Sequence, residues 1–448
     1  MGVIIDTLVR LSSFLPEIKA PTKEVPFKQK LIWTATALII FFILGQITLV
    51  GMDFASESVK QIMFAQTILA SNVGTLLTAG IGPIVMASIF LQLFVGAKLL
   101  NIDLGTGEGR SKFQALQKIL AVLLCFVEGY IFIGSGLLTP QPGFLIPLVF
   151  QIAIGSLILL YLDELVSKYG IGSGISLFIA AGVSATIFWQ TFRPQIGLEV
   201  QAGIFWSFLS TGNWILLLPL LGVIIIFLIV VFAEGIHVNI PITMGHRGTG
   251  GRYPVKFLYV SNMPVILAMS LFMNVRLWGL FLQNVPIVGT LMQGLSWAVN
   301  MPSIGGQSLI QGIIIQGGLN SITMPAIFQA VIFMILLIIT CVVFGWFWVE
   351  MGNQSTSAVA EQLEKSGMQI PGFRKDKRVI EKVLKRYIPP ITILGSIFVA
   401  LLAGGGDLVL SGISSGTGIL LTVGIIYRFY EEIAKSQADL LAPLLGKL

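Results

Sequence analysis

The sequence predicts an all-α, polytopic membrane protein with about ten transmembrane helices in two inverted halves. Of its 448 residues, 55% are hydrophobic and only 11% are charged. Long apolar runs, most of them near the ~20 residues that cross a bilayer, alternate with charged loops. If the N-terminus is cytoplasmic, all 27 lysines and arginines except Lys60, Arg193 and Arg276 lie on the cytoplasmic side.

Hydropathy sets the order of the spans, and the charges fall in the loops between them. Within lipid, the N–H and C=O groups of the backbone can form hydrogen bonds only inside a helix, so we expect each span to be helical. We place the spans at residues 31–50, 74–97, 119–138, 143–162, 171–189, 214–233, 257–275, 324–348, 387–403 and 408–427.

These spans divide the chain into two halves between two terminal segments. In the first segment, apolar residues at near-helical spacing predict a short helix lying in the cytoplasmic interface. Each half holds an odd number of spans, so the second half enters the membrane upside down relative to the first. No residue-level repeat between the halves is visible. The four parts are residues 1–30, 31–190, 191–430 and 431–448.

The second span is interrupted near its start. An apolar stretch at about residues 58–71 is too short to cross the membrane, and Gly74, Gly80, Gly82 and Pro83 follow it. Gly and Pro at this density in a membrane segment mark a broken helix or a close backbone approach. We therefore predict a short helix part-way into the membrane from outside, then a break, then a full helix.

Residues 277–323 are the hardest part of the span count, because 277–299 resembles a further span. Charge argues against it, since another crossing would carry the basic segment 365–386 to the outside. We predict instead an external, glycine-rich, partly re-entrant segment. The two substantial cytoplasmic loops are then residues 234–256 and 350–386.

Groups that could catalyse a reaction or bind a metal are scarce. Glu128 is the clear ionisable residue within a span, so it should face the interior and meet a polar neighbour such as Ser261 or Asn262. The spans contain no histidine and no paired carboxylates, and His237 and His246 share one loop. The two cysteines have no metal-ligand spacing. We expect no enzyme activity, no metal and no cofactor.

Branched aliphatic residues lie in or beside the glycine breaks. A ring of such side chains at mid-depth could close a pore by dewetting while it remains deformable. Ordinary helix packing is the competing explanation, and the residues alone leave both open. The residues concerned are Ile81, Val85, Ile171, Ile175, Ile266 and Leu421.

Several sequence blocks, spread from the second predicted span to the tenth, are similar to blocks of a known protein family. They are GTLLTAGIGPIV (74–85), YLDELVSKYGIGSGI (161–175), YVSNMPVI (259–266), KRYIPP (385–390) and GTGILLTV (416–423). Together they resemble the SecY family, the large subunit of the protein-conducting channel, and its archaeal branch in particular. The resemblance covers nearly the whole chain.

The resemblance implies an hourglass channel whose two halves surround a central pore. The aliphatic residues named above would form its constriction, and residues 58–71 an external plug. A lateral gate between spans 2 and 3 on one side and 7 and 8 on the other would release apolar segments into lipid. Its polar residues would be Glu128, Asn262 and Ser88, although Met86 stands where several relatives carry a hydroxyl. The plug residues would be Ile62, Met63, Phe64, Ala65, Ile68 and Leu69.

The resemblance also implies partners and a location. These are SecE-type and Secβ-type small membrane subunits, unfolded preproteins with signal sequences, membrane lipid, and a ribosome or another cytoplasmic driving partner. Contact with nucleic acid would be limited to ribosomal RNA. The protein would lie in the cell membrane with both termini in the cytoplasm. The contacts with the ribosome would be Arg247, Arg252, Arg374, Lys375, Lys377 and Arg378.

Two other functions compete with a protein translocation channel. A secondary transporter with inverted repeats would need a small-molecule site and a response to an ion gradient, and the near-absence of charge within the spans disfavours it. A structural membrane scaffold would tolerate replacement of its interior isoleucines. A polypeptide channel needs a path with few fixed charges, because its substrates carry charges of either sign.

Overall fold

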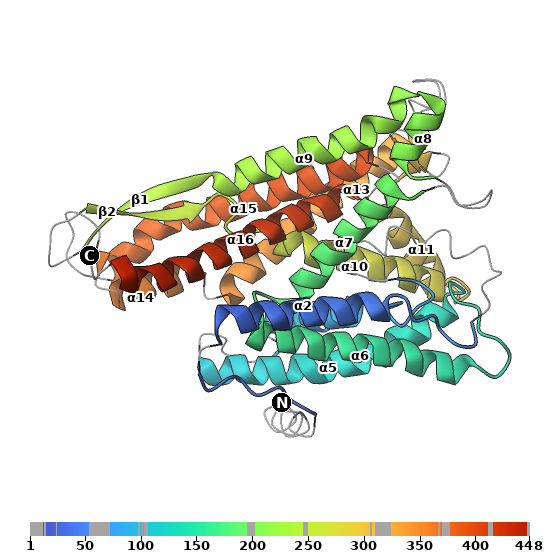
Figure 1. The fold of residues 1–448 in the computed structure, drawn as a ribbon, viewed down its shortest axis with the longest axis horizontal. Helices are drawn as coiled ribbons and strands as arrows, with labels where there is room; N and C mark the ends of the chain where they lie inside the picture. The colour runs from blue at the N-terminus through green and yellow to red at the C-terminus, as the bar shows by residue number, and fades with distance from the viewer. Residues whose placement is uncertain are drawn as a thin grey trace.

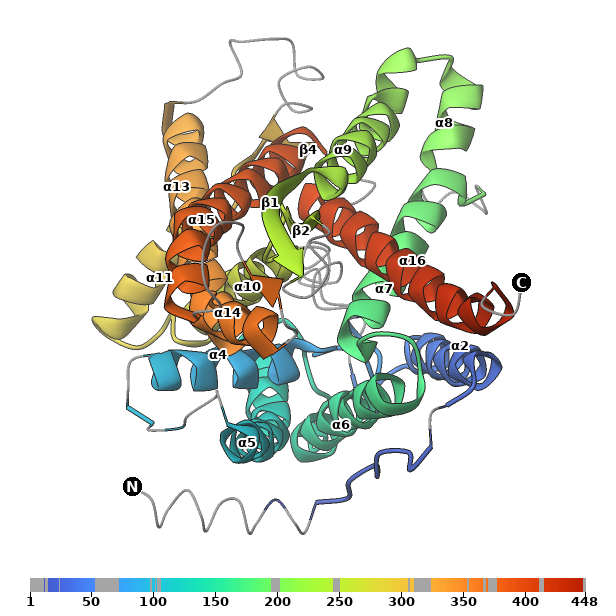
Figure 2. The same cartoon turned by 90° about the vertical axis from the view of Figure 1, so that its left-hand side faces the viewer.

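Two helical halves face each other in the computed structural model of the protein. In Figure 2 the N-terminal helices, drawn in blue and teal, lie below the orange and red C-terminal helices. Figure 1 shows the same separation from the side. The structure describes residues 12, 15–23, 25–52, 72–96, 99–100, 102, 106–194, 202–244, 250–304, 307–309, 324–352, 354–365, 368–369, 377–410 and 415–445.

The predicted spans of the N-terminal half are all present as helices. α4 begins only at Gly82, because the residues before it form turns in which Gly74 and Gly80 adopt positive φ angles of 90° and 55°. The predicted break in the second span is therefore confirmed. α5 begins before its apolar part, where the Thr106 side chain caps it by accepting a hydrogen bond from Gly109 N at 3.1 Å. The helices are α2 (Phe27–Leu44), α4 (Gly82–Gly96), α5 (Gly107–Gly134), α6 (Leu145–Tyr169) and α7 (Gly174–Phe192).

The predicted spans of the C-terminal half also correspond to helices, with two of them misplaced. The seventh span, predicted at 257–275, is the helix Met263–Phe281, which lies six residues later at both ends. Leu408 belongs to the end of the ninth span rather than to the tenth, which begins at Gly416. The ninth span is continuous with the basic segment before it, despite Pro389 and Pro390. The helices are α8 (Ile204–Thr211), η2 (Trp214–Leu217), α9 (Leu218–Gly235), α10 (Met263–Phe281), α11 (Val288–Ala298), α13 (Met324–Met351), α14 (Thr356–Lys365), α15 (Lys377–Val409) and α16 (Gly416–Leu445).

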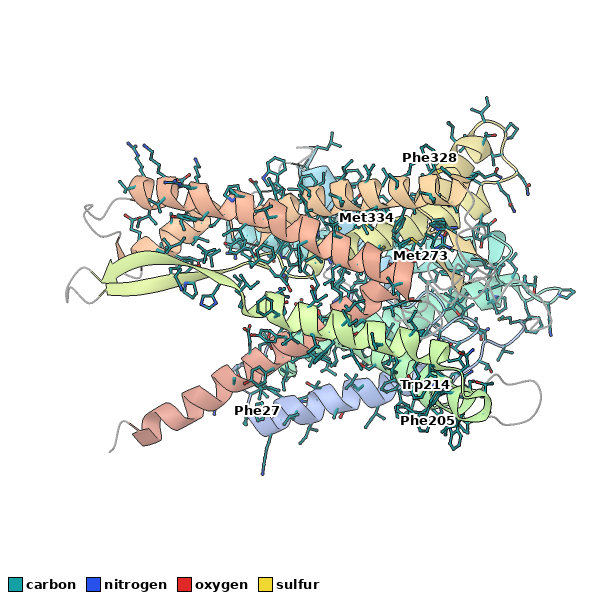
Figure 3. All side chains as sticks on the ribbon, turned by 90° about the horizontal axis from the view of Figure 1, so that it is seen from above. Phe27, Phe205, Trp214, Met273, Phe328 and Met334 are labelled. Carbon is teal, nitrogen blue, oxygen red and sulfur yellow. The ribbon has the colours of Figure 1, made fainter. Side chains whose placement is uncertain are left out.

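Length and composition support a membrane location for this bundle. Within the described ranges, eight helices are long and apolar enough to cross a membrane, and α4 is a shorter apolar helix. Large apolar side chains cover the outside of the helices (Figure 3). Trp214 is 75% exposed and Phe328 61% exposed, whereas Met273 is buried. An apolar exterior of this extent is typical of a surface that contacts lipid.

A small sheet joins the loops at residues 234–256 and 350–386, and no strand was predicted there. Strand β1 (His237–Met244) pairs antiparallel with β2 (Gly250–Lys256), and β5 (Met368–Gln369) pairs with the other edge of β1. Buried Ile240 and Val255 pack with Leu363 of α14 and with α15. The sheet and α14 lie at the left end of Figure 1, opposite α8 and α11.

Residues 277–299 do not form a further span, as the charge argument predicted. α10 ends at Phe281, and Ile287 adopts a left-handed conformation with φ of 65° before α11 begins. α11 has 11 residues, which is too short to cross a bilayer. A two-stranded hairpin follows, in which β3 (Ser303–Ile304) pairs with β4 (Gln307–Ser308).

Candidate functional site

The turns before α4 place the first two aliphatic residues. The Thr78 hydroxyl accepts a hydrogen bond from Gly74 N at 3.1 Å and donates one to Thr75 O at 2.6 Å. These short-range bonds replace the helix that Gly74 and Gly80 interrupt. Val85 N donates to Ile81 O at 3.1 Å, so both residues lie on one side of the first helical turn.

Three other segments carry the remaining aliphatic residues. Ile171 lies in the glycine-rich turn before α7, and its N–H donates to Thr34 Oγ1 of α2 at 3.1 Å. Ile266 lies in the first turns of α10, and Leu421 in those of α16. Ile81, Val85, Ile266 and Leu421 belong to one buried cluster, against which half-buried Ile175 packs. Ile171 is buried as well.

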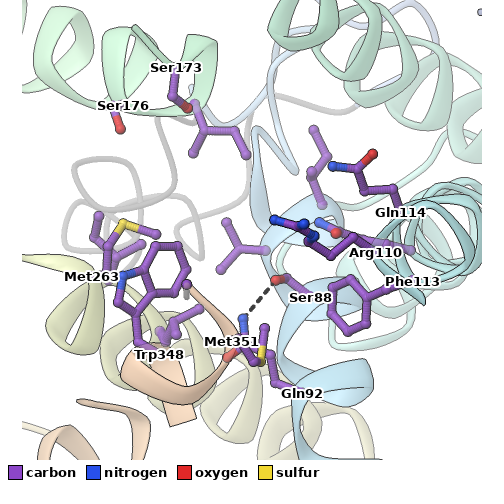
Figure 4. A pocket seen from close by; sticks show the side chains of 17 residues that line it. Ser88, Gln92, Arg110, Phe113, Gln114, Ser173, Ser176, Met263, Trp348 and Met351 are labelled. Atoms are coloured by element: carbon purple, nitrogen blue, oxygen red, sulfur yellow. Dashed lines mark hydrogen bonds between the residues drawn. The ribbon is translucent and has the colours of Figure 1, made fainter. Parts of the chain in front are cut away.

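A cavity of about 340 Å³ opens beside this cluster (Figure 4). Val85, Ile175 and Ile266 contribute to its apolar lining. The rest of the lining mixes apolar and polar side chains, and the Gln92 side chain donates to Ser88 Oγ at 2.9 Å within it. The cavity is therefore a vestibule of mixed lining that borders the aliphatic cluster. Its polar lining residues are Ser88, Gln92, Arg110, Gln114, Gln117, Ser173 and Ser176.

The predicted polar gate residues do not come together. Glu128 of α5 lines a second, mostly apolar cavity of about 370 Å³ with Met86 and Asn274. Ser88 instead faces the vestibule. Asn262 Nδ2 donates to Leu420 O at 3.2 Å, and it lies so close to α16 that a Cβ on Gly424 would be 1.9 Å from it. Asn262 therefore joins α10 to α16 rather than completing the gate.

Asn274 is the polar neighbour of Glu128 that the sequence reasoning missed. Both residues are buried, and Glu128 makes no hydrogen bond within the described part of the chain. Asn274 Nδ2 bonds back to Ser270 O at 3.0 Å in its own helix. A buried acid of this kind needs a polar partner when the surrounding helices move. The available signal was an amide within the seventh predicted span, 257–275.

Some of the predicted plug and ribosome-contact residues lie outside the described residues, and others lie within them. All the plug residues from Ile62 to Leu69, together with Arg247, Arg374 and Lys375, fall outside them. Arg252 lies in β2 opposite Pro241, Lys377 begins α15, and Arg378 is exposed.

The sheet is tied to the pore-lining helices by charged and polar contacts. Lys256 of β2 pairs with Glu431 of α16, and its Nζ lies 5.5 Å from the centre of the Tyr427 ring. Tyr259, which precedes α10, donates its hydroxyl hydrogen to Gln354 O at 2.7 Å. Burial, with a smaller effect of Tyr253, raises the pKa of Tyr259 above its usual range, so the phenol remains a donor.

The two inverted halves, the vestibule between them and the uncharged aliphatic barrier define a channel of the protein-conducting class. The sequence model of the SecY family matches residues 75–430, and that of the plug domain of Sec61p matches residues 39–74. The chain belongs to the SecY family.

Individual relatives agree along nearly the full length of the chain. The protein translocase subunit SecY of Methanocaldococcus jannaschii is 43% identical, over 98% of this chain and 99% of the relative. A solved structure described as a protein conducting channel is 42% identical, covers 98% of this chain and 100% of its own, and has a TM-score of 0.83. Sec61 in the canine ribosome-channel complex from the endoplasmic reticulum is 42% identical at the same coverage, with a TM-score of 0.80.

The chain is accordingly the central subunit of a protein translocation channel in a membrane. It passes unfolded polypeptides across the bilayer and releases transmembrane segments sideways into lipid. The alternative of a secondary transporter is excluded by this membership.

Proposed function

We propose that six aliphatic residues form the constriction that closes this translocation channel at rest. The observation that carries the proposal is that five of them, from four separate segments, belong to or pack against one buried cluster beside the vestibule. The sixth, Ile171, is buried in the turn before α7. Branched aliphatic side chains exclude water and ions from a narrow gap, yet they change rotamer as different side chains pass. The constriction residues are Ile81, Val85, Ile171, Ile175, Ile266 and Leu421.

We propose that residues 58–71 form a plug that rests on the outer side of the constriction. Support comes from the Sec61p plug-domain match, which covers the whole of this apolar segment, and from the turns at 74–81 that precede α4. Cysteines replacing Ala65 and Ile266, in a Cys125→Ala/Cys341→Ala background, should form a disulfide in the resting channel. A translocating chain should abolish the disulfide, because it displaces the plug.

One result of the cysteine experiment would contradict the plug. If the cysteine pair fails to oxidise at rest while a control pair within α4 oxidises normally, residues 58–71 do not occupy the pore.

We propose that the lateral gate opens between α4 and α5 on one side and α10 and α13 on the other. α10 packs against both α4 and α5, so the contacts of α10 with these two helices must separate when the gate opens. The second cavity lies at this boundary, with Glu128 and Asn274 on opposite helices. An apolar segment that reaches the gate enters lipid because its transfer from water is favourable. Insertion thus needs no reaction by the chain itself.

We also infer that the chain performs no catalysis and takes its driving energy from a partner. A ribosome or another cytoplasmic motor would supply it during secretion, and SecE-type and Secβ-type subunits would complete the channel. The relative solved in a ribosome-channel complex supports a ribosome as such a partner. We propose that it docks on the two long loops. Both loops contribute strands to one sheet, which presents them as a single surface. If the two loops face the ribosome, both termini lie in the cytoplasm as well.

Charge reversal tests the docking surface. Arg247→Glu combined with Arg374→Glu should weaken ribosome binding, more strongly at low salt than at high salt, because salt screens attraction to ribosomal RNA. Co-sedimentation of ribosomes with purified channel measures the change. Arg193→Glu, on the opposite membrane face, is the matched control. Equal co-sedimentation of all variants at low salt would show that the basic loops set topology alone.

A further inference from the structure

The two halves share a short sequence repeat at matching positions of the fold. In each half an aspartate of the fourth helix is followed, at identical spacing, by a Gly-Ser/Thr-Gly-Ile sequence that starts the fifth helix. The fourth helices are α6 and α15, and the fifth are α7 and α16. The repeats are Asp163 with Gly172-Ser173-Gly174-Ile175, and Asp407 with Gly416-Thr417-Gly418-Ile419.

In the N-terminal half, Asp163 caps the start of α7. Its Oδ1 accepts a hydrogen bond from Ile175 N at 2.8 Å, whereas Ser173 at the N-cap position makes no side-chain capping bond. The two helices approach so closely that a Cβ on Gly174 would lie 2.5 Å from the Cα of Asp163. The carboxylate thus holds the turn that carries constriction residue Ile175.

In the C-terminal half, Asp407 also bonds to the start of α16, but at a position two residues earlier in the repeat. Its Oδ1 accepts from Thr417 N at 3.1 Å, and its Oδ2 accepts from the Thr417 hydroxyl at 2.7 Å. Both residues are buried. A Cβ on Gly416 would lie 2.3 Å from the Cα of Gly406, so this junction is equally tight. The carboxylate holds the turn that precedes constriction residue Leu421.

We propose that Asp163 and Asp407 are equivalent positioning residues of the inverted repeat, which hold α7 and α16 in the register that keeps the constriction closed. α7 and α16 pack against each other, so a tilt of either helix shifts Ile175 relative to Leu421. α7 runs toward α8, whereas α16 runs toward the opposite end (Figure 1), so the aspartates act from opposite directions. The proposal rests on the constriction proposed above.

Resting ion conductance of the purified channel complex in planar bilayers tests the proposal. Asp163→Ala and Asp407→Ala should each raise the conductance per folded channel about tenfold, which corresponds to ~1.4 kcal/mol in the open–closed equilibrium. Asp163→Asn and Asp407→Asn should give smaller increases, because one acceptor oxygen remains. Thr417→Val should give an increase similar to that of Asp407→Asn, since it removes the hydroxyl that bonds to Oδ2 but keeps the N–H that bonds to Oδ1.

Glu164→Gln is the matched control. Glu164 is next to Asp163, but its carboxylate pairs with Lys118 and Lys168 instead of α7. A merely structural role would lower thermal stability or yield in the aspartate variants without raising conductance per folded channel. If an alanine variant does not assemble, the asparagine variant of the same residue decides the test.

The outcomes separate this proposal from the constriction itself. If substitutions in the constriction leak but the assembled aspartate variants remain closed, the positioning role is wrong and the constriction stands. If Glu164→Gln leaks as much as Asp163→Asn, the effect is not specific to the repeat and the proposal is overturned. If neither class leaks, both proposals are wrong.

Discussion

Replacing Ile81 and Ile175 with asparagine is expected to make the resting channel conduct small ions. The two residues come from different segments of the barrier, and each amide offers water hydrogen bonds that isoleucine does not. If hydration of the gap becomes easier by about 1–3 kcal/mol, the open population should rise by roughly one to two orders of magnitude. Conductance of purified channels in planar bilayers measures the effect.

The control for this prediction keeps the aliphatic character of the barrier. Ile81→Leu with Ile175→Leu preserves size and apolarity, so it should remain closed. An asparagine double variant that assembles and conducts no more than the leucine variant would show that packing, and not pore closure, explains these residues.

Replacing Gly155 with alanine is expected to destabilise the N-terminal half. A Cβ at this position would lie 1.8 Å from the carbonyl oxygen of Leu76, which is backbone and cannot rotate away. α6 or the turns that carry Ile81 must therefore move. Overpacking of this kind costs about 1–3 kcal/mol, occasionally more. The thermal unfolding midpoint of the purified channel should fall, and its resting conductance should rise.

Gly405 provides the comparison for Gly155. It is also a glycine within a long helix, α15, but a Cβ there would meet nothing within 4 Å. Gly405→Ala should therefore leave stability unchanged or raise it slightly, because alanine is the better helix former. Similar unfolding midpoints for the two variants would contradict the close approach between α6 and the turns.

Much of the architecture could be predicted from the sequence because a segment that crosses lipid must be apolar, helical and long enough to span the bilayer. The break before Gly82 and the rejection of a further span at 277–299 both followed from glycine density and charge placement. The start of the last span was wrong because 408–410 are apolar and nothing in hydropathy marks the end of α15. The small sheet was missed because its pairing depends on contacts between two distant loops.

The details of the site depended on geometry that one sequence does not contain. Asn262 and Asn274 lie on the same helix, and only the crossing of α5 over α10 decides which of them faces Glu128. The repeat around Asp163 and Asp407 was not recognised because few residues are shared. Its significance appears when both carboxylates are seen at the starts of pore-lining helices.

The central claim is that translocating polypeptides pass through the aliphatic constriction between the two halves. The direct measurement is to stall a nascent chain in the channel and detect its crosslinks to a photoreactive group placed at Ile81, Ile171, Ile266 or Leu421. We predict crosslinks from all four positions to the segment of the chain within the membrane, and none from outward-facing Phe328. Efficient translocation without any crosslink at the four positions would contradict the account.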